Sequence, residues 1–285
     1  MTPPPTAPPP RPAPPLRSQP LTWLYAPGDR PDVVRKALAS GADVVIVDLE
    51  DAVPPDRKAH ALAATAELLS SPHPVPVHVR LPSAHDTTAI TTLAPLPGLA
   101  ALRVPKVTHG TDIHRVAALA PGVPLHALLE SALAVEHAHA LATAHPAVRG
   151  IALGEADLRA DLGLREDGGL DWSRSRVVVA ARAAGLPPPV QSVHPDVLDL
   201  DGLAASCAHG RALGFLGRAA IHPRQLPVIE RAYLPTPEEV TAAEEIVEAA
   251  ATGAGALALP DGRFVDAAVV AAARRTLSLA SAHRA

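Results

Sequence analysis

The sequence predicts an α/β protein built as a TIM (β/α)8 barrel with a C-terminal helical extension. Short apolar runs alternate with helix-like stretches, and most of these runs end in a charged or polar residue. Such alternation favours right-handed βαβ units around a parallel sheet. The 285 residues fit one barrel with additions, since barrels of this type run to about 250 residues.

The predicted strands are short and apolar. The clearest is Val44-Val45-Ile46-Val47, which is apolar on both faces, as a buried parallel strand is. We expect strands near residues 21–26, 43–49, 75–80, 99–105, 123–129, 148–154, 189–193 and 216–221. We expect helices near 31–40, 56–70, 86–93, 111–119, 131–144, 173–184, 200–213 and 224–233. The threonine-rich segment 86–93 is the weakest of these, because threonine is a poor helix former.

Three regions follow from composition. Residues 1–20 contain ten prolines and predict a disordered tail. Residues 21–234 predict the catalytic barrel, with a glycine- and charge-rich loop at 161–172. Residues 235–285 predict the C-terminal extension.

Within the extension, Pro237 suits the first turn of a helix. A hairpin is expected to turn at Asp261-Gly262, since an Asp-Gly pair favours a tight turn. A last helix is expected near residues 266–281.

Charge and composition exclude several classes of function. The net charge of −4 argues against nucleic-acid or anionic-membrane partners. A single cysteine, Cys207, rules out an internal disulfide and fits a reducing compartment. No apolar run reaches the roughly 18 residues of a membrane span, and the N-terminal segment lacks a signal-peptide core. We therefore expect a cytoplasmic location.

Glu130 and Asp157 are candidate metal ligands. Glu130 ends the fifth predicted strand, and Asp157 follows the sixth. If these strands are neighbours, both carboxylates lie at the barrel rim, the end where the strands finish. Together with water and substrate oxygens they would suit Mg²⁺ or Mn²⁺. The alternative is that each acid caps the helix that follows it.

A second acidic group follows the second strand. Asp48 and Glu50 are two residues apart and should face the same side, with Asp51 just beyond them. Buried acids need a cation, a metal or water. A catalytic role and an ion pair with Arg30, Arg57 or Lys58 both remain open.

Basic residues also fall at predicted strand ends. His78 and Arg80 are two apart on the third strand, so we expect both to face the barrel mouth. Lys106 ends the fourth run. Gly28-Asp29-Arg30-Pro31 forms a turn before a helix that could seat a phosphate, although such a turn is usually structural. The sequence lacks the glycine-rich nucleotide motifs, zinc spacing and nucleophile elbow.

Several segments together resemble the citrate lyase beta-subunit family of CoA-ester lyases, which includes citryl-CoA and malyl-CoA lyases and is related to metal-dependent hydroxy-oxo-acid aldolases. The resemblance extends in order over about residues 21–280. The matching segments are Leu24-Tyr-Ala-Pro-Gly-Asp-Arg-Pro31, Ser40 to Val53 with Lys58, Val104-Pro-Lys106, Leu129-Glu-Ser-Ala132, Ala152 to Gly163, Asp201-Gly202-Leu203, Gly214 to Pro223 and Asp261 to Asp266.

The resemblance implies a TIM barrel assembled as a homotrimer or hexamer. It assigns the metal to Glu130 and Asp157, and places Glu50 and Asp51 near substrate. The family usually has Val-Arg-Val-Asn on its third strand, whereas this chain has Val77-His-Val-Arg80. His78 therefore stands where the family has arginine, and Arg80 where it has asparagine.

The sequence thus predicts a Mg²⁺-dependent carbon–carbon lyase that acts on a 3-hydroxyacyl-CoA or related 2-oxo-acid aldol. Glu50, Asp51, His78 and Arg80 are the predicted catalytic residues. Arg30, Asp48 and Lys106 are the predicted contacts to the oxo acid and the CoA thioester. The alternatives are an acyl-CoA thioesterase of the same fold and a non-catalytic ligand-binding relative.

Overall fold

The computed structural model describes residues 19–251, 257–259 and 261–282. Contacts divide these residues into two compact units, Pro20–Glu230 and a second one made of Gln19 with the residues from Arg231 onward. The predicted tail lies almost wholly outside the described residues.

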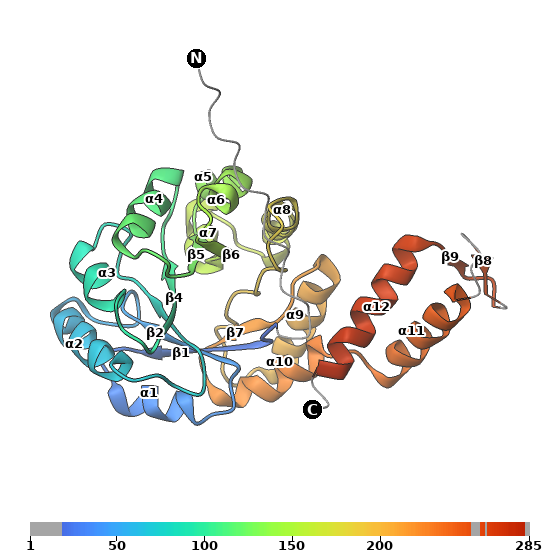
Figure 1. Ribbon diagram of the computed structural model, residues 1–285, viewed down its shortest axis with the longest axis horizontal. Helices are drawn as coiled ribbons and strands as arrows, with labels where there is room; N and C mark the ends of the chain where they lie inside the picture. The colour runs from blue at the N-terminus through green and yellow to red at the C-terminus, as the bar shows by residue number, and fades with distance from the viewer. Residues whose placement is uncertain (1–18, 252–256, 260, 283–285) are drawn as a thin grey trace, which may run out of the picture. The chain divides into compact units, whose positions relative to one another are not determined.

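A seven-stranded parallel sheet forms the centre of the first unit (Figure 1). Its strands lie in the order β6-β5-β4-β3-β2-β1-β7, so that consecutive strands are neighbours from β1 to β6. Their bounds are β1 (Thr22–Pro27), β2 (Val44–Asp48), β3 (Val77–Arg80), β4 (Leu99–Val104), β5 (Leu125–Leu129), β6 (Val148–Leu153) and β7 (Arg218–Ala220). This is an α/β architecture of the TIM-barrel type.

The predicted strand at 189–193 is wrong in this structure. Only Gln191 makes an isolated parallel bridge, to Arg218 of β7. The chain leading to it is Leu186 followed by three prolines, and prolines have no N–H to donate to a ladder. Toward β6, the Glu155 backbone N–H donates to Ser192 Oγ at 3.4 Å. The eighth position of the sheet is therefore an extended segment in place of a full strand.

Helices follow the strands largely as predicted, except that the 131–144 helix is two helices that meet at His137. The weak segment 86–93 forms a helix as predicted, and the Ala89 N–H donates to the capping Asp86 side chain at 2.9 Å. The bounds in this unit are α1 (Pro31–Leu38), α2 (Lys58–Leu69), α3 (Thr87–Leu93), α4 (Gly110–Leu119), α5 (Ala132–Glu136), α6 (Ala138–Thr143), α7 (Glu155–Leu162), α8 (Asp171–Ala183), α9 (Leu200–Leu213) and α10 (Leu226–Tyr233), the last of which continues into the second unit. Short 3₁₀ turns lie at Pro55–Arg57, Asp167–Leu170 and Pro223–Gln225.

The predicted loop at 161–172 is helical at both ends, because residues 161–162 end α7 and residues 171–172 begin α8. Helix α7 was missed, because its acidic first turn was assigned to the strand end. It ends at Gly163, whose φ of +64° is the left-handed conformation typical of a helix C-terminus. The intervening loop is therefore shorter than expected.

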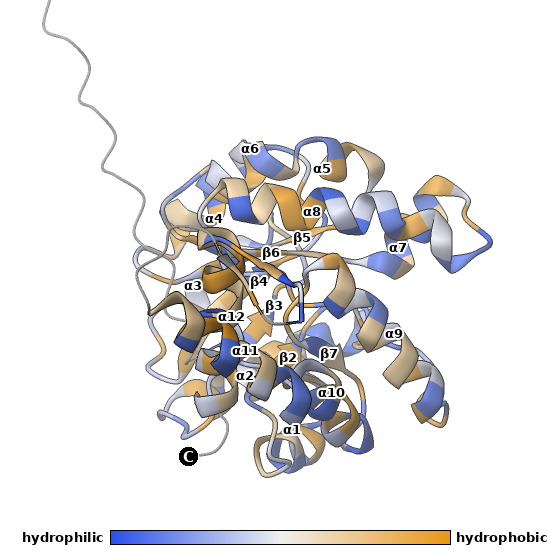
Figure 2. Ribbon diagram, turned by 90° about the vertical axis from the view of Figure 1, so that its right-hand side faces the viewer, coloured by the Kyte–Doolittle hydropathy of each residue, from blue (hydrophilic) through white to orange (hydrophobic). Residues whose placement is uncertain are grey.

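The apolar strand residues make the core. All of Val44–Asp48 is buried, which agrees with a strand covered on both faces. The surrounding helices carry both hydrophobic and hydrophilic residues, as Figure 2 shows, with Val34 and Ala37 of α1 and Ile113 and Val116 of α4 among those that are buried.

The second unit contains α11 (Pro237–Ala250) and α12 (Ala267–Ala282), which pack against each other, and the antiparallel pair β8 (Leu257–Ala258) and β9 (Phe264–Val265). Thr236 and Glu239 cap the start of α11 reciprocally. The turn includes Gly262 at a φ of +90°, so the predicted hairpin is confirmed. Among the described residues, no helix is both long and apolar enough to span a membrane.

Candidate functional site

A buried ion pair links the ends of β2 and β3. Arg80 is in register with Asp48, and its guanidinium donates Nε to Oδ1 at 2.7 Å and Nη2 to Oδ2 at 2.6 Å. Burial would raise the pKa of Asp48, but the hydrogen bonds and charge of Arg80 outweigh burial and leave this pKa lowered. Asp48 therefore orients Arg80 by a two-pronged contact of the kind that fixes a guanidinium in one plane.

The same guanidinium meets two further carboxylates. Arg80 Nη1 lies 2.9 Å from Glu50 and 3.3 Å from Asp51, and Lys106 Nζ lies 2.9 Å from Glu50 and 3.8 Å from Asp51. Burial raises the pKa of Glu50, and the two cations offset this only in part. The pairing with Glu50 raises the pKa of Lys106, so the ammonium stays charged. Three carboxylates and two cations thus meet at the rim.

The partners proposed from sequence for these acids differ from those in the structure. Arg57 lies 3.6 Å from Asp29. Lys58 donates to the backbone carbonyls of Leu49 and Glu50 and so holds the loop that carries the acids. The acids themselves pair with Arg80 and Lys106.

Glu130 is held by backbone geometry. Lys106 has a φ of 53°, a strained value for a residue other than glycine, and in this conformation its N–H donates to Glu130 Oε2 at 2.8 Å. A Cβ on Gly154 would lie 2.6 Å from Glu130 Oε1, so a larger residue would displace the carboxylate. Both features keep Glu130 at one place on the rim.

Like charges surround Glu130. Burial, together with the negative charges of Glu50 and Asp157, raises the pKa of Glu130 to about 7, despite the Lys106 N–H and the charge of Arg80. Asp157 lies in the first turn of α7 and is half-buried. Its side chain makes no hydrogen bond to any other described residue. A cation between these carboxylates would relieve their repulsion, which is the behaviour expected of metal ligands.

The donor set fits a hard divalent cation. Carboxylate oxygens are what Mg²⁺ prefers, and Mg²⁺ sites commonly use one or two carboxylates with water and substrate oxygens completing the shell. Within the part of the chain that the structure describes, no three histidine, cysteine or acidic side chains form a closed metal cage. Glu130 and Asp157 would therefore form an open site.

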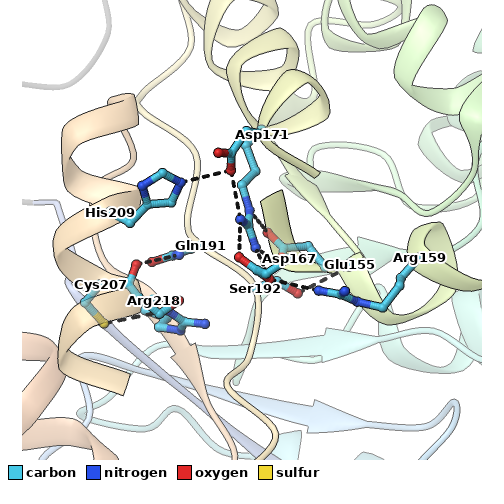
Figure 3. Close-up of polar contacts among 11 residues, drawn as sticks. Glu155, Arg159, Asp167, Asp171, Gln191, Ser192, Cys207, His209 and Arg218 are labelled. Atoms are coloured by element: carbon cyan, nitrogen blue, oxygen red, sulfur yellow. Dashed lines mark hydrogen bonds and ion pairs between the residues drawn. The ribbon is translucent and has the colours of Figure 1, made fainter. Parts of the chain in front are cut away.

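A buried arginine that sequence reasoning missed supports α7. Arg174 of α8 donates Nε and Nη2 to Glu155 at 3.0 and 2.8 Å, and it also pairs with Asp167 and Asp171, which accepts from His209 at 2.9 Å (Figure 3). The arginine holds the pKa of Asp167 at about 2. Glu155 is two residues before Asp157, so this network fixes the helical turn that carries Asp157.

Beside this network, Figure 3 shows the segment at the eighth sheet position. Gln191 donates to the Ser206 carbonyl at 3.0 Å, and Arg218 donates to Ser206 Oγ at 2.9 Å. These contacts with α9 hold the segment around Gln191 in place, where the backbone hydrogen bonds of a full strand are missing. Nothing in the sequence pattern singles out these contacts, since each joins residues far apart in the chain.

Two predicted site residues lie away from this group. His78 is on the same face as Arg80 but one layer deeper, buried against Trp23, so it does not reach the mouth beside Arg80 as expected. The reason is that a two-residue step moves about 6.6 Å down the strand. Arg30 precedes α1 and is exposed. The catalytic and binding roles of all these residues stay predictions.

Comparison with known proteins settles the family. Residues 21–223 match the HpcH/HpaI aldolase/citrate lyase family. The chain belongs to this family. It is 36% identical over 271 residues to a (3S)-malyl-CoA thioesterase of Cereibacter sphaeroides, covering 91% of this chain and 94% of the relative. It is 31% identical over 289 residues to the L-malyl-CoA/beta-methylmalyl-CoA lyase of the same species, covering 87% and 90%.

A solved structure is also similar. The protein CitE from Mycobacterium tuberculosis, in complex with magnesium, acetoacetate and coenzyme A, superposes with a TM-score of 0.79 at 32% identity, covering 93% of this chain and 99% of that one. The resemblance seen in the sequence is thus confirmed at the level of the family and its fold.

Proposed function

We propose that this protein is a Mg²⁺-dependent carbon–carbon lyase that cleaves a 3-hydroxyacyl-CoA of the malyl-CoA type into a 2-oxo acid and a shorter acyl-CoA. The observation that carries the proposal is the raised pKa of Glu130, which burial and the negative charges of Glu50 and Asp157 push to about 7. The relative solved with magnesium, acetoacetate and coenzyme A supports this choice of metal and substrate class.

Glu130 and Asp157 would hold the cation. When bound, Mg²⁺ supplies a Lewis acid and a template for the carboxylate and the neighbouring oxygen of the oxo-acid half. In the cleavage, the hydroxyl gives up its proton, and the bond between the hydroxyl carbon and the carbon next to the thioester breaks. The electron pair remains on that second carbon as a thioester enolate, which then takes up a proton.

The cations at the rim have different roles in this proposal. The side chain of Arg80 is 13% exposed and is held by Asp48, so its fixed positive charge favours negative charge developing near it. Lys106 has a side chain that is 57% exposed, so its ammonium can leave Glu50 and meet an incoming carboxylate or thioester oxygen. Glu50 and Asp51 hold both cations in place until substrate arrives. Arg30 is exposed before α1 and would contact the CoA part.

The second candidate is a thioesterase, and a specific observation favours it. The relatives at 36 and 35% identity are named (3S)-malyl-CoA thioesterase. In that reaction water attacks the thioester carbonyl, the carbon–sulfur bond breaks, and free CoA thiol leaves with the intact hydroxy acid. The same carboxylates would bind the acid half in both reactions.

One assay separates the candidates. The full-length protein is incubated with Mg²⁺ and malyl-CoA, while oxo acid is measured as its phenylhydrazone and free thiol with a disulfide reagent. Oxo acid in amounts equal to acetyl-CoA supports the lyase. Free thiol without oxo acid overturns it in favour of the thioesterase, and binding without either product would indicate a non-catalytic relative. Asp157→Asn serves as the matched inactive variant, and Asp196→Asn, an exposed loop acid, as the control.

A further inference from the structure

The interior of the barrel below the rim contains polar side chains as well as the apolar cluster of Trp23, Val44, Ile46 and Ala219. Such interiors are usually filled by branched apolar side chains. Here the ring of Trp23 lies 5.2 Å from that of His78 and 5.9 Å from that of His126, and the two histidine rings are 4.9 Å apart. The guanidinium carbon of Arg103 lies 5.4 Å from the Trp23 ring centroid. We call these four side chains the interior cluster.

Arg103 carries the charge of the interior cluster. It is only 3% exposed, and its Nε and Nη1 are buried with no hydrogen-bond partner among the described residues of the chain. Burial, together with the positive charge of Arg103, lowers the pKa of His126 to about 3, and burial also lowers the pKa of His78. Both histidines are therefore neutral at pH 7, and neither adds positive charge nor offsets that of Arg103.

The acids at the rim already have cationic partners. Asp48 and Glu50 pair with Arg80, and Glu50 also pairs with Lys106. A guanidinium buried without an anion destabilises the folded protein, because the lost hydration of its charge is not replaced by an opposite charge. A cation–π contact with the face of Trp23 is weaker than that penalty. The cation–π contact alone therefore does not balance the burial of Arg103.

Gly150 makes room for one ring of the interior cluster. A Cβ on Gly150 would lie 2.7 Å from His126 Nδ1, so the absence of a side chain there admits the His126 ring. His78 Nδ1 is also buried without a hydrogen-bond partner among the described residues. Polar nitrogen atoms from two strands, His78 of β3 and Arg103 of β4, thus lie close to the ring of Trp23.

We propose that the interior cluster binds one small monovalent anion, with Arg103 as its principal ligand and His78 as a further polar contact. One negative charge balances one guanidinium, whereas a phosphate dianion would exceed it. Two sources share this chemistry: a free halide, and the carboxylate group of a small organic acid. The site is separate from the carboxylates at the rim and does not depend on the proposed lyase activity.

Fluorescence of Trp23 reports the binding directly. The chain has two tryptophans, and Trp172 is 60% exposed, so Trp172→Phe leaves Trp23 as the single reporter. Sodium bromide, or separately sodium formate, is titrated against sodium gluconate at constant ionic strength. The proposal predicts saturable quenching by bromide and a rise in Tm of about 3–6 °C at saturation. A response to formate alone would identify the carboxylate as the source.

Arg103→Met supplies the decisive comparison. It should abolish the bromide response and raise Tm in gluconate, because an unpaired buried charge is removed. Arg115→Met, which removes an exposed arginine of α4, should leave the response unchanged. An equal response in Arg103→Met, or no response of the parent protein to either bromide or formate, overturns the proposal. If Arg103→Met does not fold, crystals soaked in bromide decide: an anomalous peak beside Arg103 is expected, and its absence overturns the proposal.

Discussion

Replacing Glu130 with glutamine should stabilise the metal-free protein, and more so as pH rises. The folded-state pKa of Glu130 is raised from 4.5 to about 7, so the folded protein binds this proton more tightly than the unfolded chain does. Below pH 4.5 the carboxyl is protonated in both states and carries no penalty. The penalty grows as pH rises and is complete above pH 7.

The size of the effect follows from the two pKa values. At about 1.36 kcal/mol per pH unit, the interval from 4.5 to about 7 corresponds to about 3 kcal/mol. About 2 kcal/mol of this difference develops between pH 5.5 and pH 8. Glutamine keeps an oxygen that can accept the Lys106 N–H, so the variant removes the charge and retains the hydrogen bond.

Urea unfolding in EDTA at pH 5.5 and pH 8 measures this difference. Glu136→Gln, at an exposed position of α5, is the control and should show no such pH dependence. Added Mg²⁺ should then stabilise the parent protein at pH 8 by about 2.7 kcal/mol at a hundredfold excess over Kd, and leave Glu130→Gln unchanged. If the free energy of unfolding of Glu130→Gln equals that of the parent protein at both pH values, the raised pKa assigned to this carboxyl is refuted.

The remaining predictions concern the supports of the site. Gly154→Ala should lower Mg²⁺ affinity at least about 10-fold by calorimetry, whereas Gly168→Ala, where a Cβ meets open space, should not. Arg174→Met should cost about 3–5 kcal/mol in urea unfolding because it leaves buried acid unpaired, and the exposed Arg182→Met should cost little; equal costs would contradict the buried network. Arg80→Met should lower kcat at least about 100-fold with Mg²⁺ affinity less affected, and an unchanged kcat would remove Arg80 from the mechanism.

Strand and helix order could be predicted because local patterns determine them. The apolar run at 44–47 and the helix start at Pro237 depend on neighbours in sequence, and both are confirmed. The prediction of a strand at 189–193 was wrong because it relied on the apolar residues there. The three prolines at 187–189 have no N–H to donate to a strand ladder. Helix α7 was absent from the predicted helices because Asp157 was interpreted mainly as a metal ligand after the strand, although capping of a following helix was the stated alternative.

The sequence predicted which residues form the candidate site, but it did not predict how far each side chain lies below the rim. Period two placed His78 and Arg80 on one face, but it gives no distance from the rim, and the structure buries His78 a layer lower. Arg174 and Arg103 could not be found from the sequence, since their significance depends on which groups from distant strands and helices surround them. Conversely, the bidentate pairing of Arg80 with Asp48 follows from strand register, which only the fold supplies.

The most direct test of the central claim is a crystal structure of the full chain with Mg²⁺ and oxaloacetate. The account predicts one cation with an oxygen of Glu130 and an oxygen of Asp157 at about 2.0–2.1 Å, and with oxaloacetate oxygens in its remaining positions. A cation bound elsewhere, or carboxylates more than about 10 Å apart, which no single ion at these bond lengths could bridge, would contradict it.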